Sequence, residues 1–322
     1  MSISRNQLCR CGSGKKFKRC CGLLAKTPVP GASVAPEALE ELLDLAQQGA
    51  FSELETRTRA LLPSATQPAV LWQLLAVARQ RQGKEAIEAL EEAVRLLPDD
   101  AVALLNLATE YARAARTRDA EDGYHRALQL APQFPEAYAN LAALKLSLGD
   151  AAEAIAMADR AVELKPDYAA AFFTRGNAFM RLGRHEEAQA SFRRAIDLSP
   201  ALAEAHLGLA LQRRALGRLE EAEAGLQRAL AVAPDYAAAH IELATTLRLQ
   251  GRSADCKASC QAALRLVPQS AAARAVLAEL AADAGDFATA AVLHREALAC
   301  DPDWVDSSAA LTRLKRFEKP DG

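Results

Sequence analysis

Residues 135–168 read PEAYANLAALKLSLGDAAEAIAMADRAVELKPDY, and this stretch decides the fold because the chain repeats its pattern many times. A constant interval between equivalent residues is typical of an array of stacked structural repeats. The sequence therefore predicts a repeat protein over most of its 322 residues. The residues that set the interval are seven evenly spaced prolines, Pro98, Pro132, Pro166, Pro200, Pro234, Pro268 and Pro302.

Small residues keep the same phase as the prolines. Gly149 precedes Pro166 by the same interval by which Gly183 precedes Pro200, and alanines such as Ala154 and Ala161 recur in equally fixed places before the proline. A glycine separates one helix from the next, alanines let two helices approach closely, and the proline ends the second helix. Each repeat is therefore predicted to be a helical hairpin.

The composition agrees with thin helical layers. Apolar residues make up 51% of the chain and aromatic residues only 5%, which suits an alanine-rich array better than one large core. The chain has no apolar run of about 18 residues that would span a membrane, and its start lacks the apolar stretch of a secretory signal. We therefore expect a protein without a membrane span in the reducing cytoplasm.

The N-terminal segment 1–26 differs from the rest of the chain. It contains four of the seven cysteines, Cys9, Cys11, Cys20 and Cys21, together with seven basic residues and no acidic residue. In a reducing compartment a dense cysteine cluster binds metal more readily than it forms disulfides, and zinc takes four soft ligands in a tetrahedron. The sequence therefore predicts that these four cysteines hold Zn²⁺. The remaining residues carry a net charge of about −9 within a formal total of −2.

The run from Cys9 to Cys21, CRCGSGKKFKRCC, resembles the SEC-C motif, a zinc knuckle found in many bacterial proteins. The resemblance implies a closed, structural zinc site, which in related proteins is a docking element for protein partners. We accordingly expect the N-terminal segment 1–26, which we call the head, to bind a protein partner through a basic patch. The patch comprises Arg10, Lys15, Lys16, Lys18 and Arg19.

The repeating unit resembles the tetratricopeptide repeat, because Tyr138, Leu141, Ala142 and Gly149 occupy signature positions of that family. The resemblance implies an all-α fold, a TPR α-solenoid in which helical hairpins form a right-handed superhelix. The chain is thus expected to divide into a zinc-binding motif (1–26), a Pro- and Gly-rich linker (27–36), an array of about eight units (37–304), and a capping helix with a tail (305–322).

Two local departures from the pattern carry predictions of their own. Gly83 lies closer to Pro98 than Gly149 lies to Pro166, which predicts a short second helix in that unit. A further helix, at about Val305–Phe317, is expected to cover the end of the array. Several reactive residue types fall at core positions of the repeat and are predicted to be packing residues rather than ligands, namely Cys256, Cys260, His206, His240 and His294.

In this architecture the first helix of each hairpin lines the concave side of the array. Its residues include an apolar line and asparagines, whose amides can bond the backbone of a bound peptide, and arginines follow near the helix ends. We expect this groove to bind an extended or helical protein segment. Its predicted residues are Asn106, Asn140, Phe173, Asn177, Leu207, Ile241, Arg181, Arg214 and Arg248. An alternative is that the apolar line only packs against the next hairpin and the asparagines face water.

These features favour a non-catalytic scaffold with a zinc-stabilised docking head and a peptide-binding groove. One alternative is the regulatory part, or a degenerate relative, of a bacterial sulfotransferase, since a SEC-C motif followed by repeats looks like the front of such enzymes. The chain stops before any strand pattern or phosphosulfate loop, so no activity of its own is expected. A second alternative is binding of nucleic acid or the ribosome through the basic head, which the acidic body disfavours.

Overall fold

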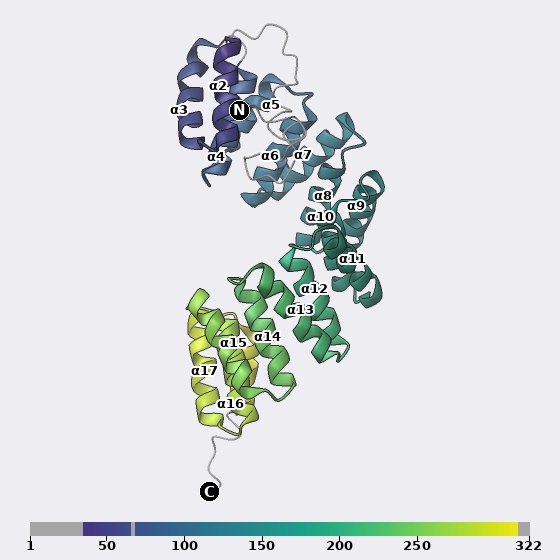
Figure 1. The fold of residues 1–322 in the computed structure, drawn as a ribbon, viewed down its shortest axis with the longest axis vertical. Coiled ribbons are helices and arrows are strands. Elements are labelled where there is room, and N and C mark those ends of the chain that lie inside the picture. The colour runs from purple at the N-terminus through teal and green to yellow at the C-terminus, as the bar shows by residue number, and fades with distance from the viewer. Residues whose placement is uncertain (1–34, 66–67, 315–322) are drawn as a thin grey trace. The chain divides into compact units, whose positions relative to one another are not determined.

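The computed structural model describes residues 35–65 and 68–314, so the cysteine-rich head and the linker up to residue 34 lie outside the described residues. Within the described residues the chain forms 17 α-helices and one short 3₁₀ helix, with no strands (Figure 1). The chain separates into two compact units, residues 1–144 and 145–322. The prediction of an all-helical repeat fold is therefore confirmed.

The first unit contains three hairpins and the beginning of a fourth. Its described helices are α2 (Pro36–Gln48), α3 (Phe51–Leu61), the 3₁₀ helix η2 (Leu62–Ser64), α4 (Ala69–Arg81), α5 (Ile87–Leu96), α6 (Ala101–Arg113), α7 (Thr117–Leu130) and α8 (Pro135–Ser147), which ends in the second unit.

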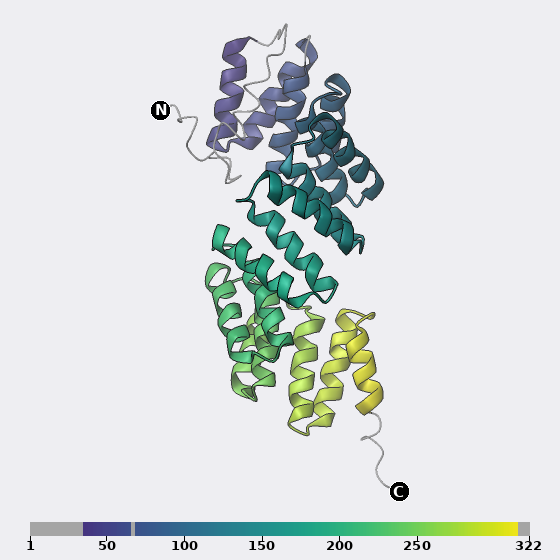
Figure 2. The same ribbon diagram turned by 90° about the vertical axis from the view of Figure 1, so that its right-hand side faces the viewer.

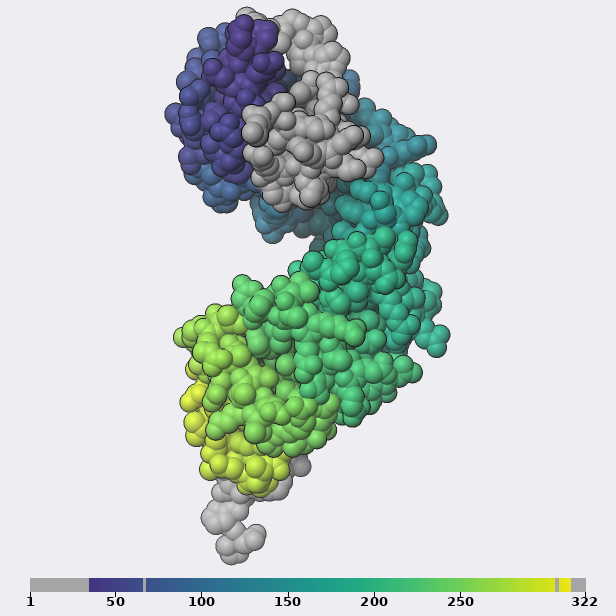
Figure 3. Space-filling view, in the orientation of Figure 1, coloured from purple at the N-terminus to yellow at the C-terminus, as the bar shows by residue number. Residues whose placement is uncertain are grey.

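The second unit continues with regular hairpins and one last helix. Its helices are α9 (Ala151–Leu164), α10 (Ala169–Arg181), α11 (His185–Leu198), α12 (Ala203–Ala215), α13 (Leu219–Val232), α14 (Ala237–Leu249), α15 (Ser253–Leu266), α16 (Ala271–Asp283), α17 (Phe287–Cys300) and α18 (Val305–Leu314). Paired helices of this unit run side by side in Figure 2. On the face shown in Figure 3, side chains fill the spaces between its successive helices.

The helix boundaries follow from the small residues that keep the phase of the repeat. Each regular first helix has 13 residues and is followed by a residue in the left-handed region. This residue is a glycine in most turns, such as Gly149 at φ 94° and Gly183 at φ 69°, and it is Ala115 at φ 56° after α6. Such a residue ends a helix and turns the chain into the next one. In the unit where Gly83 lies closer to its proline, α5 has 10 residues, whereas α7 has 14 residues. The predicted short second helix is confirmed.

Helices within a hairpin pack closely because their contact residues are small. Ala120, Ala154 and Ala161 are fully buried. A Cβ added at Gly123 of α7 would lie only 2.8 Å from the Cβ of Ala108 on α6. Packing of this closeness leaves room only for hydrogen or a methyl group, which explains why small residues recur at these positions.

One large side chain fills the junction between two hairpins of the second unit. The ring of Phe192 on α11 is fully buried. A Cβ added to Gly176 or to Gly208 would come within 2.7 Å of that ring. The two glycines therefore exist in helix interiors, where glycine is otherwise unfavourable by roughly 1 kcal/mol, because the ring occupies the space of their side chains.

The first hairpins of the chain are held by a buried carboxylate. Glu55 of α3 is 4% exposed, and its carboxylate accepts hydrogen bonds from Lys84 Nζ at 2.7 Å and Gln82 Nε2 at 2.9 Å. Arg59 pairs with it at 3.0 Å. The hydrogen bond from Lys84 is the largest effect lowering the pKa of this carboxyl group. The ion pairs thus join α3 to the turn after α4.

The last helix covers the end of the array, as predicted. Leu311 of α18 packs against the buried pair Ala290 and Ala291 of α17. At the same junction Ser307 and His294 are both buried, and the imidazole Nδ1 lies 3.0 Å from the serine Oγ. Phe317, which was also expected on this helix, lies outside the described residues.

Candidate functional site

The apolar line predicted for the first helices lies on one side of the second unit. Phe173 on α10, Leu207 on α12 and Ile241 on α14 occur at equivalent positions of successive hairpins, and all three are partly buried. The ring of Phe173 lies 6.0 Å from that of Phe192, and Leu207 and Ile241 pack against a shared apolar cluster. These side chains thus combine a packed inner part with an accessible outer part, and they form the apolar face of the second unit.

The predicted asparagines have different surroundings. Asn140 of α8 donates from Nδ2 to the hydroxyl of Thr109 on α6 at 3.1 Å, so half of its amide already joins two neighbouring hairpins. Asn106 and Asn177 are partly buried, and within the described residues their side chains make no hydrogen bond. In the second unit, therefore, Asn177 is the asparagine of this set with a free amide.

The three predicted arginines bond to neighbouring first helices. Arg181 donates to the carbonyl oxygen of Leu146 at 3.0 Å. Arg214 of α12 pairs with Glu242 of α14, and Arg248 of α14 pairs with Glu279 and Asp283 of α16, both at 2.6 Å. The charges of Arg214 and Arg248 are matched within the array, whereas Arg181 bonds a neutral carbonyl. All three arginines tie consecutive hairpins together. Sequence reasoning placed them on the correct helices but did not identify these partners, which lie about one repeat away.

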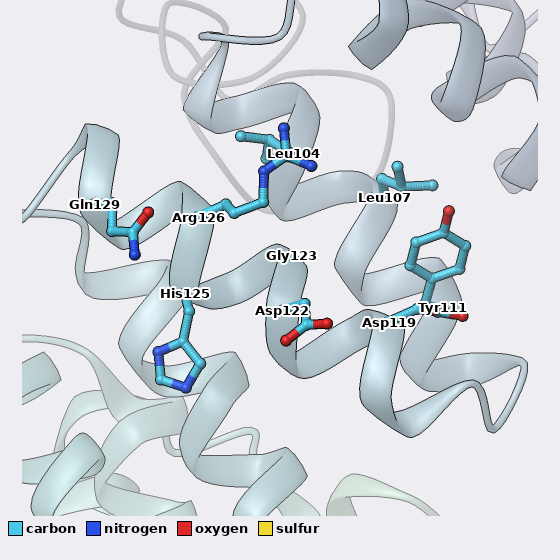
Figure 4. A pocket seen from close by; sticks show the side chains of 9 residues that line it. All are labelled: Leu104, Leu107, Tyr111, Asp119, Asp122, Gly123, His125, Arg126 and Gln129. Carbon is cyan, nitrogen blue, oxygen red and sulfur yellow. The ribbon is translucent and has the colours of Figure 1, made fainter.

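A pocket of about 500 Å³ lies over the α6–α7 hairpin of the first unit. Leu104, Leu107 and the ring of Tyr111 form one wall, while the His125 ring and the Arg126 guanidinium extend to opposite sides of α7 (Figure 4). The Tyr111 hydroxyl donates to Glu91 at 2.7 Å, and burial, with that carboxylate, raises the pKa of Tyr111 to about 12. A phenol with this pKa keeps its proton at neutral pH and does not act as a base.

The cysteines and histidines that could suggest metal binding or catalysis in the second unit are packing residues. Cys256 and Cys260 of α15 are fully buried in an apolar cluster, and a hydrogen bond with Cys256, together with burial, raises the pKa of the Cys260 thiol. His206 and His294 are also buried, and His240 is partly buried. The rings of His206 and His240 each bond the carbonyl of the preceding repeat proline, at 3.0 Å. Their predicted packing role is therefore confirmed.

The predicted metal ligands Cys9, Cys11, Cys20 and Cys21 and the basic docking patch lie outside the described residues. In the part of the chain that the structure describes, no group of three or more His, Cys, Asp or Glu residues is arranged to hold a metal ion. None of the described helices is long and apolar enough to cross a membrane.

Hairpins of this size and phase define an α-solenoid repeat protein. A tetratricopeptide repeat model matches residues 135–168, a second TPR repeat model matches residues 176–213, and a SEC-C motif model matches residues 5–23. The chain therefore contains tetratricopeptide repeats and, near its N-terminus, a SEC-C motif. No curated protein sequence shows significant similarity to it.

Solved structures of TPR proteins share the fold. A chain of the APC/C hetero-tetramer Cut9-Hcn1 aligns with a TM-score of 0.68 at 17% identity, over 93% of this chain and 59% of that one. The type IV pilus biogenesis factor PilW gives 0.60 at 26% identity, over 66% and 98%. A tetratricopeptide repeat protein from Parabacteroides merdae gives 0.58 at 18% identity, over 83% and 99%. This chain thus spans 59% of the length of the Cut9-Hcn1 chain that it matches.

Proposed function

We propose that this protein is a non-catalytic scaffold that joins two protein partners, one at the apolar face of the second unit and one at the zinc-stabilised head. The repeats and their structural likenesses support a protein-interaction role in general. The observation that carries the specific proposal is the apolar face itself, where Phe173, Leu207 and Ile241 keep accessible surface on consecutive first helices.

The contacts around this face favour a partner that contributes apolar side chains. Asn140 is bonded to Thr109, and Arg214 and Arg248 are neutralised by acidic residues of the next first helix. A bound segment would therefore gain mainly from apolar burial, at about 25 cal/mol per Å², with Asn177 available for one or two hydrogen bonds to its backbone. An extended or helical segment with apolar side chains fits this requirement.

Affinity capture with the full chain tests the face. The variant Phe173→Asp places a carboxylate on the apolar face and is expected to lose the partners captured by the wild type. Leu216→Asp, at a side chain 46% exposed beyond the end of α12, is the matched control and should keep them. Because Phe173 also contacts Phe192, circular dichroism must show equal helicity, and Leu207→Asn serves as a second variant. Capture of the same partners by all variants would exclude the apolar face.

The zinc part of the proposal rests on the donor set. The four thiols between Cys9 and Cys21 provide the soft ligands and the number that a closed zinc site requires, and the SEC-C motif model covers all of them. Cys9, Cys11, Cys20 and Cys21 would hold the ion, which would stabilise a segment too small for a core of its own. Reduced thiols are needed, so a cytoplasmic location belongs to the same proposal.

Metal analysis of the purified chain tests this part. We expect one zinc per chain, and none after Cys9→Ser combined with Cys20→Ser. Replacing the buried pair by Cys256→Ala and Cys260→Ala is the control and should leave the zinc content unchanged. Zinc that persists in the head variant, or that is lost in the control, would contradict the assignment.

A further inference from the structure

The repeats allow one surface position to be compared between hairpins. Glu91 of α5, Asp159 of α9 and Arg193 of α11 occupy the same place relative to their repeat prolines. Glu91 pairs with Arg116 of the following hairpin at 3.3 Å, and Asp159 pairs with Arg175 of the following hairpin at 2.9 Å. The junction after α11 therefore has a cation where those two have a carboxylate, while the remaining second helices have His125, Gln227, Gln261 and Arg295 at this place.

The charge of Arg193 acts on Arg213, a cation that is fixed in place. Arg213 of α12 has a side chain only 16% exposed, and its closest carboxylate is Glu221 of α13 at 3.4 Å. One Nη of Arg213 donates to the backbone carbonyl of Glu221 at 3.3 Å. Its Nε is buried and has no hydrogen-bond partner within the described residues. The Arg213 guanidinium is therefore held in place while some of its N–H groups have no acceptor.

Two arginines share a single carboxylate here. Glu221 is shared with Arg218, at 3.9 Å. Arg193 is exposed, and in the described part of the chain it bonds only the side-chain oxygen of Gln189, at 3.3 Å. Arg228 of α13 is exposed and has no ion-pair or hydrogen-bond partner among the residues that the structure describes.

The charges of Arg193, Arg213, Arg218 and Arg228 repel one another. The pKa of Arg213 is lowered first by burial and further by Arg193, Arg228 and Arg218, while Glu221 is the one anion that opposes these effects. Like charges gathered around a partly buried cation destabilise the free protein, and an added anion would relieve the repulsion. The excess positive charge is thus a local feature of a chain that is acidic outside its head.

We propose that Arg193, Arg213, Arg218 and Arg228, which we name the Arg213 cluster, bind an acidic protein segment through its clustered Asp or Glu carboxylates. Guanidinium groups bind carboxylates with two parallel hydrogen bonds, and four of them on adjacent helices and their connecting turn can engage several carboxylates of one segment. A short peptide can contact this cluster alone. A longer nucleic acid strand would extend along an array whose net charge is negative and be repelled by it. The site would add a second kind of partner to the array.

A charge-compensating variant tests the proposal without damaging the fold. Arg193→Glu restores the acid found at the equivalent place in α5 and α9, so it should raise the urea midpoint of unfolding while removing binding. Arg265→Glu on α15 is the matched control, because Arg265 is also an exposed arginine of a second helix and the charge change is identical. The basic head is present in all variants, so differences between them report on the array.

The probe is a fluorescein-labelled octaglutamate peptide titrated with the full-length chain at low salt and followed by fluorescence anisotropy. We expect binding at least 10-fold weaker for Arg193→Glu, unchanged binding for Arg265→Glu, and crosslinks from a photoreactive version of the peptide within residues 189–228. Equal affinities for wild type and Arg193→Glu, or crosslinks confined to residues 1–26, would overturn the proposal. Tighter binding of an eight-nucleotide RNA that Arg193→Glu abolishes would overturn the assignment to a protein segment.

Discussion

Ala115 stands in the same place relative to Pro132 as Gly149 does relative to Pro166, and its backbone still adopts φ 56°. The left-handed region costs an L-residue about 1–2 kcal/mol, whereas glycine adopts it freely but is more flexible in the unfolded chain. Ala115→Gly should therefore raise the free energy of unfolding by about 0.5–1 kcal/mol, measured by urea denaturation.

The reverse change is the control for that prediction. Gly183 has φ 69°, and an added Cβ would meet no atom within 4 Å, so Gly183→Ala tests backbone strain alone. It should lower the free energy of unfolding by a similar amount, about 1 kcal/mol. If both variants were neutral, the left-handed conformation would not contribute to the stability of these turns.

A second residue-scale prediction concerns Gly208. A Cβ at this position would lie 2.7 Å from two atoms of the buried Phe192 ring, and overpacking of a filled core typically costs about 1–3 kcal/mol. Gly208→Ala should therefore destabilise the protein by about 1–2 kcal/mol despite the better helix propensity of alanine. Adding Phe192→Leu should restore part of the loss, and a double-mutant cycle measures that coupling. Strictly additive effects would show that the ring and the glycine do not share space.

At the residue scale the sequence predicted positions better than it predicted partners. The repeat register placed Phe173, Asn177 and Leu207 on the first helices, and it identified the buried histidines and Cys256 as packing residues. The bond between Asn140 and Thr109 could not be predicted, because it depends on where two helices from different repeats meet. The left-handed Ala115 could have been found by noting that its turn has the spacing of the glycine turns, since the backbone path follows the repeat rather than the residue type.

At the scale of the element, the interface between α17 and α18 at the end of the array, which we call the seam, contains a titratable residue. His294 of α17 and Ser307 of α18 are buried and hydrogen-bonded. Burial lowers the pKa of His294 from 6.5, with a further decrease from Arg313 and a partial increase from Glu279. At pH values between the native pKa of His294 and about 6.5, the unfolded chain binds more protons than the native chain. The contribution of the neutral His294 to the free energy of unfolding is therefore complete above about pH 6.5 and is lost as the pH falls.

The corresponding prediction concerns the pH dependence of stability. The wild type should lose stability between pH 7 and pH 5, and His294→Gln, which keeps a donor and an acceptor near Ser307 but does not titrate, should lose less. Urea unfolding at several pH values measures the difference between the two proteins. The exposed His125 provides the control, because His125→Gln should leave the wild-type dependence in place. Parallel curves for wild type and His294→Gln would contradict the role of the seam.

Element boundaries were the most predictable feature, because they depend on local signals. The short interval between Gly83 and Pro98 alone predicted that α5 would be a short helix, and the residues after Pro302 predicted α18. The ties between elements were less predictable. Glu55 with its cationic partners, and the arginines that pair with the next first helix, are long-range contacts whose partners have no fixed position in the repeat.

At the scale of the whole molecule, an array of hairpins differs from a globular core because each hairpin packs mainly on its neighbours. Stability is then distributed locally, and a weakened junction opens without unfolding distant repeats. Gly208→Ala lies at the junction of α10 to α12 in the second unit, while α2 to α5 belong to the first unit. The variant therefore provides a local perturbation whose spread can be followed along the chain.

Hydrogen exchange measured by mass spectrometry can show how far the effect of Gly208→Ala spreads along the chain. In Gly208→Ala, peptides from residues 169–232 should exchange faster than in the wild type, peptides from the hairpins on either side should change less, and peptides from residues 36–96 should be unchanged. Uniformly faster exchange over all helices in Gly208→Ala would mean that the array unfolds as one cooperative body. The free energy of unfolding would then be a property of the whole array and not of its separate junctions.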